Sequence, residues 1–163
     1  MRVNRKCPGC GQVGTLALGQ TDAGSCVGAS RFVMEVPAWV CGGCGEAILS
    51  SETVGAMEGA VTRELVASGA QDPAALRWLR KTAGLSGAEL AGLLGVVSET
   101  VSGWESGGQK PERATVLVLG ELALDALAGR RDMRGRLDLV ATAASSGPEA
   151  DPARLVLSGK RAA

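Results

Sequence analysis

The hydrophobic positions of residues 1–50 repeat with the two-residue period of short β-strands. In TLALG, Leu16 and Leu18 lie on one side of the chain. In SRFVMEVPAWV, Phe32, Met34 and Val36 occupy every second position. This alternation predicts two short strands with one buried face. Residues 20–30, between them, are rich in Gly and Ser and are predicted to form a turn.

Beyond Gly45 the hydrophobic period changes to that of a helix. Residues 50–69 carry apolar side chains at helical spacing: Val54, Met57, Val61, Leu65 and Val66. Ser50 or Ser51 is suited to cap the start of this helix. Gly69 and Pro73 then interrupt the pattern, so residues 51–72 are predicted to be a linker helix followed by a hinge.

Residues 73–129 divide into four predicted helices. The first covers residues 74–83. The second begins at Ser86, where Glu89 three positions later forms a capping box, and ends at Gly95. After a turn of three residues, the third is predicted to be capped by Ser98 and to end at Gly107. Pro111 is predicted to open the fourth helix in its first turn.

Two short helices joined by a tight Gly-containing turn are typical of a helix-turn-helix. The stretch SGAELAGLLGVVSETVSGWESGGQKP resembles the DNA-binding domains of the Cro and lambda-repressor family. The resemblance implies that the third helix enters the major groove, and it assigns base or phosphate contacts to its N-terminal half. The residues at those positions are Ser98, Glu99, Thr100 and Ser102. The N–H groups of the helix starts at Ser86 and Ser98 can hold phosphates, and Lys110 and Arg113, which follow the third helix, are expected to contact the phosphate backbone. The plainer interpretation is a helical bundle without a DNA site.

The fourth helix is apolar around most of its circumference. Between Ala114 and Ala128 only Glu121 and Asp125 are charged. A helix of this kind must be buried on more than one side. We therefore predict a homodimer through residues 111–128, which would place two reading helices about one DNA turn apart. The alternative is burial within a single chain, under the linker helix or the C-terminal segment.

Composition changes this picture only slightly. The 17 Lys and Arg residues balance the 17 Asp and Glu residues, so net charge does not by itself indicate a nucleic-acid partner. The first residues lack a signal peptide and no stretch is apolar enough to cross a membrane, so a cytoplasmic protein is expected. Residues 130–163 are predicted to be a C-terminal extension that either forms a further helix or remains loosely held. The basic cluster at its start, Arg130, Arg131, Arg134 and Arg136, either contacts DNA or is solvated.

The cysteines carry the most specific chemical signal. Cys7 and Cys10 form one CxxC pair, and Cys41 and Cys44 form a second thirty residues later. Two such knuckles supply four thiolates in the tetrahedral arrangement that Zn²⁺ prefers, so we predict one structural zinc per chain. Redox pairs, disulfides or a rubredoxin-like iron site are the alternatives. Cys26 is left over. Because four protein ligands close the metal site, and because no other catalytic motif is present, we expect that the chain is not an enzyme.

The combination of these parts resembles a known family. A four-cysteine zinc-ribbon, CPGCG to CGGCGE, followed by a helix and a Cro-like helix-turn-helix is similar to the MqsA antitoxins, over residues 5–127. This implies an α+β but mostly α fold, with a zinc-ribbon at residues 1–50 that neutralises a toxin, usually an RNase. The helix-turn-helix at residues 73–129 would then repress the operon of the pair. A stand-alone regulator and, more remotely, an electron carrier are the competing hypotheses.

Overall fold

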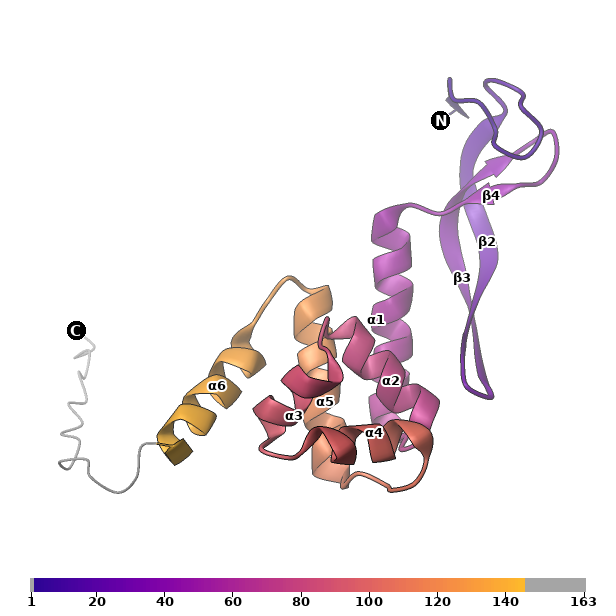
Figure 1. Cartoon of the computed structure of the whole chain (residues 1–163). Helices are drawn as coiled ribbons and strands as arrows, with labels where there is room; N and C mark the ends of the chain where they lie inside the picture. Colours follow the sequence, from indigo (N-terminus) through magenta and orange to yellow (C-terminus); the bar gives the residue numbers. More distant parts are fainter. Residues whose placement is uncertain (1, 146–163) are drawn as a thin grey trace, which may run out of the picture.

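The computed structural model describes residues 2–145 and shows a small sheet at one end of the molecule and a group of helices at the other (Figure 1). The chain is mostly helical, as predicted. The strands are β1 (Arg2–Val3), β2 (Leu16–Val27), β3 (Ser30–Cys41) and β4 (Ala47–Ile48). The helices are α1 (Ser51–Ala67), α2 (Pro73–Thr82), α3 (Gly87–Leu94), α4 (Ser98–Ser106), α5 (Arg113–Leu127) and α6 (Asp132–Ser145).

The sheet is antiparallel in the order β1-β2-β3-β4 and is dominated by one long hairpin. Strands β2 and β3 pair along their whole length, from Leu16 opposite Cys41 to Val27 opposite Ser30. The prediction of a turn over residues 20–30 was therefore wrong, because only Gly28 and Ala29 form the turn. The strand carries small and polar side chains, which give a weak hydrophobic signal, and its partner strand supplies the missing stability.

The tip of the hairpin returns to the helices instead of standing alone. Val27 is buried in the same hydrophobic cluster as Val61 of α1 and Leu76 of α2, and Phe32 and Met34 pack against that cluster. The Cβ of Ala74 lies close to Gly28 in the turn. The hairpin and the helices therefore share a core, while the cysteine pairs lie at the opposite end of the hairpin.

Helix α1 is formed as predicted, with Ser50 as its N-cap. Its C-terminal half does more than link two regions, because Val61 and Leu65 are 1% and 2% exposed within the core. It packs against α5 so closely that a side chain at Gly120 would meet Val66. The connection to α2 is held by Gln71, whose Nε2 donates to the carbonyl of Pro111 at 2.7 Å.

The starts and ends of α3 and α4 follow from capping residues. The capping box of Ser86 and Glu89 is present, and Gly95 and Gly107 end the two helices with left-handed backbones. Ser98 is not the N-cap of α4, however. Val97 takes that position with an extended backbone and no side-chain bond, which leaves Ser98 as the first helical residue with an exposed side chain.

The prediction that Pro111 opens the fourth helix was also wrong. Helix α5 starts at Arg113 with Glu112 as its N-cap. Pro111 stays outside because its buried position and its hydrogen bond from Gln71 tie it to the connection between α1 and α2. The buried residues of α5 face α1, α2 and α6: Val116, Leu119, Gly120, Leu122, Ala123 and Asp125.

Burial within one chain thus accounts for most of the apolar surface of α5. Leu117 is the large apolar side chain of α5 that remains exposed, at 53%. The homodimer through residues 111–128 stays a prediction. The extension does form a helix, α6, over residues 132–145. The end of the predicted extension, residues 146–163, lies outside the described residues. Within residues 2–145, no helix combines the length and hydropathy needed to cross a membrane.

Candidate metal centre and helix pair

The two CxxC pairs form knuckles with nearly the same backbone hydrogen bonds. The N–H groups of Cys7 and Cys41 donate to carbonyls five residues ahead, both at 2.8 Å. The N–H groups of Gly11 and Gly45 donate back to the carbonyls of those cysteines at 2.9 and 2.8 Å. Both glycines have positive φ, 76° and 79°, which glycine adopts without strain. The glycine after each pair is therefore part of what folds the knuckle.

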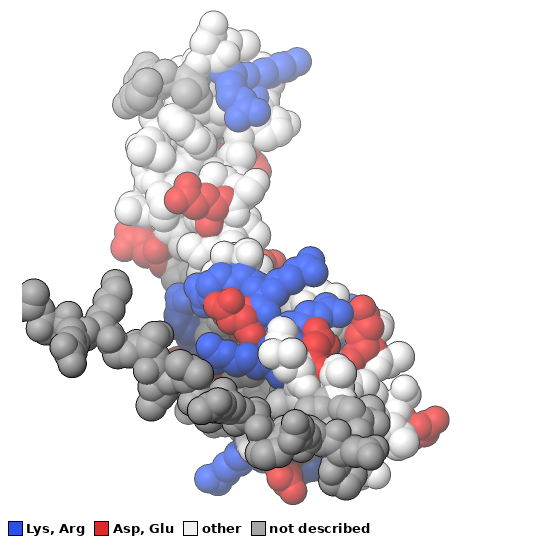
Figure 2. Space-filling view, turned by 90° about the vertical axis from the view of Figure 1, so that its left-hand side faces the viewer, with Lys and Arg blue, Asp and Glu red and all other residues white. Residues whose placement is uncertain are grey.

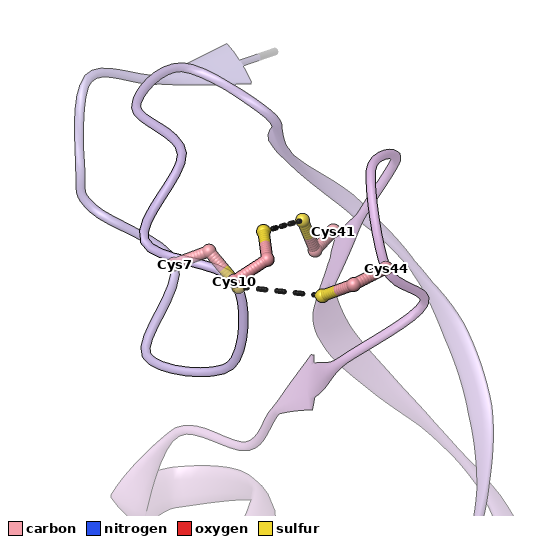
Figure 3. A group of neighbouring side chains, drawn as sticks. All are labelled: Cys7, Cys10, Cys41 and Cys44. Carbon is pink, nitrogen blue, oxygen red and sulfur yellow. Dashed lines mark hydrogen bonds between the residues drawn. The ribbon is translucent and has the colours of Figure 1, made fainter.

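The four cysteine sulfurs converge between the knuckles (Figure 3). The sulfurs of Cys7 and Cys44, and those of Cys10 and Cys41, are each 3.7 Å apart, and all four lie within 4.8 Å of one another. Sulfurs placed about 2.3 Å from a central zinc ion would be about 3.8 Å apart at tetrahedral angles. A disulfide would require about 2.05 Å. The spacing therefore fits a metal tetrahedron and does not fit a pair of disulfides.

The electrostatics of the cluster also call for a cation. The hydroxyl of Thr15, 3.1 Å from the sulfur of Cys41, and the N–H of Gly43 lower the pKa of Cys41 to about 6. The N–H of Glu46 lowers the pKa of Cys44, but desolvation and the neighbouring thiols outweigh it and raise that pKa to about 12. The pKa values of these two cysteines thus move in opposite directions, so without a metal the Cys41 sulfur ionises far more readily than that of Cys44. A bound dication removes this conflict and lets all four be thiolates.

Around the cluster there is little apolar packing to hold the fold. Cys7, Leu16 and Cys41 form a small buried cluster of their own, with Trp39 and Ile48 packed against it. Such a minimal core is typical of regions that rely on a metal for stability. Four thiolates suit both zinc and iron. Cys26 lies exposed near the tip of the hairpin and takes no part in the site.

Helices α3 and α4, joined by residues 95–97, form the helix pair that the sequence predicted. Val101 and Trp104 of α4 are buried in the core, 2% and 8% exposed. The opposite side of α4 presents Ser98, Glu99 and Ser102 to solvent. Thr100 is half-buried, and its N–H bonds to the carbonyl of Val97 within the turn.

The other residues predicted to contact DNA differ in whether their polar groups already have partners within the chain. The N–H of Ser86 donates to Glu89 at 2.8 Å, and the Ser86 hydroxyl accepts from the N–H of Glu89 at 3.2 Å. This capping box occupies part of the start of α3 that was predicted to bind phosphate. Lys110 and Arg113 are exposed and form no ion pair with another described residue.

Sequence reasoning missed the ion pair that fixes α4 against α2. Arg80 donates through Nε and Nη2 to both carboxylate oxygens of Glu105, and Arg77 donates to the same residue. The Arg80 guanidinium lowers the pKa of Glu105, partly opposed by desolvation. Arg80 also donates to the carbonyl of Leu85 at 2.7 Å, so it ties the start of α3 to the same point. Nothing in the linear sequence pairs residues 25 positions apart.

Comparison with known families agrees with this arrangement. Residues 5–125 match a family model described as the antitoxin component of a bacterial toxin–antitoxin system, MqsA. A comparison with curated proteins gave no match. The matched segment includes both cysteine pairs, the hairpin, α1 and the helix pair, and it ends within α5. The chain therefore belongs to the MqsA family of antitoxins.

Proposed function

We propose that this chain is an antitoxin that neutralises a cognate toxin through its metal-bearing N-terminal part and represses the operon of the pair through its helix pair. The observation that carries the proposal is the family match, which spans both the cysteine cluster and α3–α4 in one chain. The role is regulatory, and the four cysteines close the metal site against a reacting ligand.

The metal is proposed to be one zinc ion per chain, held by Cys7, Cys10, Cys41 and Cys44. Its contribution is structural, because it fixes the two knuckles and joins the N-terminal loop to the end of β3. The sulfur spacing and the small surrounding core support this role. In the reducing cytoplasm that we expect for this chain, thiolates bind metal in preference to forming disulfides.

For the toxin, the face of β3 against α1 offers a suitable surface. A groove of about 440 Å³ lies between the hairpin and the start of α1, with an apolar floor that includes Met34, Trp39 and Met57. Glu35 and Glu52 lie at this groove, and neither pairs with a cation among the described residues. An RNase toxin needs basic surface to bind its RNA, so exposed carboxylates beside an apolar groove complement it.

A second feature of the hairpin agrees with a basic partner. Asp22 lies directly opposite Glu35 in the β2–β3 register, and both side chains are exposed. Like charges directly opposite each other destabilise a hairpin. A toxin cation placed between the two carboxylates would offset that repulsion.

For DNA, the exposed N-terminal half of α4 is proposed to enter the major groove, with Ser98, Glu99, Thr100 and Ser102 nearest the bases. Lys110 and Arg113 follow the pair and are proposed to contact the phosphate backbone. Ser86 would contribute the start of α3 as a further backbone contact. A homodimer through α5, with the exposed Leu117 at its contact, would present two such helices to one operator.

Affinity capture of the tagged chain from its native host tests the proposal. We expect a small protein at equal stoichiometry whose expression alone arrests growth, with growth restored when this chain is co-expressed. Matched capture with Glu35→Lys and Glu52→Lys should lose that partner, while Glu64→Lys, at the far end of α1, should retain it. Capture without any partner, together with specific promoter binding, would instead support a stand-alone regulator.

A further inference from the structure

Residues 73–127, the helical region proposed to bind DNA, contain few of the positive charges that DNA binding requires. Residues 73–127 contain five basic residues against six acidic ones. The basic residues are Arg77, Arg80, Lys81, Lys110 and Arg113, and the first two are engaged by Glu105. DNA affinity rests largely on cations that replace the counterions of phosphate. A helical region with this balance of basic and acidic residues has few cationic side chains that can contact phosphate.

In the segment that follows, residues 130–138, basic residues outnumber acidic ones. Four arginines, Arg130, Arg131, Arg134 and Arg136, lie at and just before the start of α6, beyond residue 125, where the family match ends. Asp132 and Asp138 are the acidic residues of the same stretch. Figure 2 looks onto the side of the molecule where α6 lies and shows Lys and Arg side chains gathered around a few carboxylates over the helices.

Helix α6 is fixed in place by the side chain of Asp125 in α5. This carboxylate is 8% exposed and accepts the N–H of Met133 at 2.9 Å, which caps α6 from outside its own helix. It also accepts from Arg130 at 2.9 and 3.1 Å. Met133 and Leu137 pack against the main core. The arginines of α6 are therefore presented by an anchored element.

The anchored helix lies against α3 of the helix pair. The carboxylate of Glu89, which caps the start of α3 at Ser86, is 3.7 Å from the guanidinium of Arg134. Arg131 and Arg136 are exposed and form no ion pair with another residue of the range 2–145. The arginine cluster is thus continuous with the part of α3 that is proposed to contact a phosphate.

We propose that α6 extends the DNA-binding surface, with Arg131 and Arg136 contacting the phosphate backbone beside the start of α3. This inference rests on the proposed DNA-binding function and adds to it an element that lies outside the family match. Arg130 and Arg134 position the helix through Asp125 and Glu89. The contacts are electrostatic, so they raise affinity for any duplex and carry no sequence preference.

The test measures binding of the full-length chain to a mixed-sequence DNA duplex over a range of salt concentrations. For the double variant Arg131→Ala with Arg136→Ala, the slope of log K against log salt should fall by about 1.8, because each lost phosphate contact removes about 0.9. The matched control is Arg31→Ala with Arg63→Ala, which removes the same charge from exposed positions on the hairpin and α1. This control should keep the wild-type slope.

The outcomes separate this inference from the function on which it rests. If the wild-type chain binds the duplex and both double variants keep the wild-type slope, α6 is not part of the DNA surface, and the helix-pair proposal survives. If both variants lose the same amount, net charge and not the position of α6 governs binding, which also overturns the inference. If the wild-type chain does not bind duplex DNA even at low salt, the DNA-binding function fails and this inference fails with it.

Discussion

The contact between α1 and α5 yields a quantitative prediction at Gly120. Replacing glycine by alanine inside a helix ordinarily stabilises it by about 1 kcal/mol. At Gly120, in the middle of α5, the new methyl group would collide with a methyl group of Val66 in α1. Valine is stiff about χ1 in a helix, so the methyl group cannot simply rotate away. Overpacking of this kind costs about 1–3 kcal/mol.

We therefore expect Gly120→Ala to lower the free energy of unfolding by about 1 kcal/mol, measured by urea denaturation followed by circular dichroism. The control is Gly55→Ala in α1, where a new methyl group meets nothing within 4 Å. That variant should gain stability, by up to about 1 kcal/mol.

A double-mutant cycle locates the cause. In a Val66→Ala background the space next to Gly120 opens, so Gly120→Ala should become neutral or stabilising. The coupling free energy between the two positions should then be about 2 kcal/mol. If Gly120→Ala alone is as stable as Gly55→Ala, α1 does not pack on α5, and the account of α1 as part of the helical core is refuted.

Four further expectations follow from the site. Cys41→Ser should abolish metal binding and remove the dispersed NMR signals of the knuckles. The hairpin tip should keep its signals because it is packed on α1 and α2. Retained knuckle signals would contradict a structural metal. Glu35→Lys should stabilise the hairpin against urea by up to about 1 kcal/mol, because the new lysine pairs with Asp22. The same variant should bind the toxin more weakly in a titration. An unchanged affinity would exclude the groove between β3 and α1 as the toxin site. Lys110→Ala should lower the salt-dependence slope of DNA binding by about 0.9, and an unchanged slope would remove Lys110 from the interface. The pKa of Glu105 is lower in the folded than in the unfolded chain, so the stability that its ion pair contributes is complete above a pH of about 4.3 and is lost as the pH falls through the folded-state pKa. Glu105→Gln should therefore make the free energy of unfolding depend less on pH in this acidic range. Identical acid-unfolding curves for the variant and the wild type would show that the ion pair does not support α4.

The cysteine cluster and the helix pair could be predicted because their signals are local. A CxxC pair followed by glycine defines a knuckle from five adjacent residues, and the capping box at Ser86 with Gly95 defines α3 in the same way. The convergence of Cys7 and Cys41 spans more of the chain, but the chemistry of four thiolates requires it. Local backbone geometry and the chemistry of metal binding are therefore sufficient to predict the cysteine cluster and the helix pair.

Features that depend on distant contacts could not be predicted in the same way. Residues 20–30 read as a turn because their small polar side chains lack a hydrophobic period, and it is the pairing with β3 that makes residues 20–27 part of a strand. Val97 displaced Ser98 as the N-cap because the turn needs an extended backbone at that point. In the sequence Asp125 is only one of the two charged residues of the fourth helix, whereas in the fold it caps α6. The strand and the cap of α6 depend on a partner in another element, which the local pattern of residues does not contain.

Native mass spectrometry of the full-length chain, purified together with its captured partner, reports the metal and the partner in one spectrum. We expect a complex in which each copy of this chain carries one zinc ion and is bound to a small toxin. Removing the zinc with a chelator should release the toxin. A metal-free chain that still binds the toxin, or a zinc-loaded chain that binds none, would contradict the claim that the four-cysteine centre holds the toxin-neutralising part of this protein in shape.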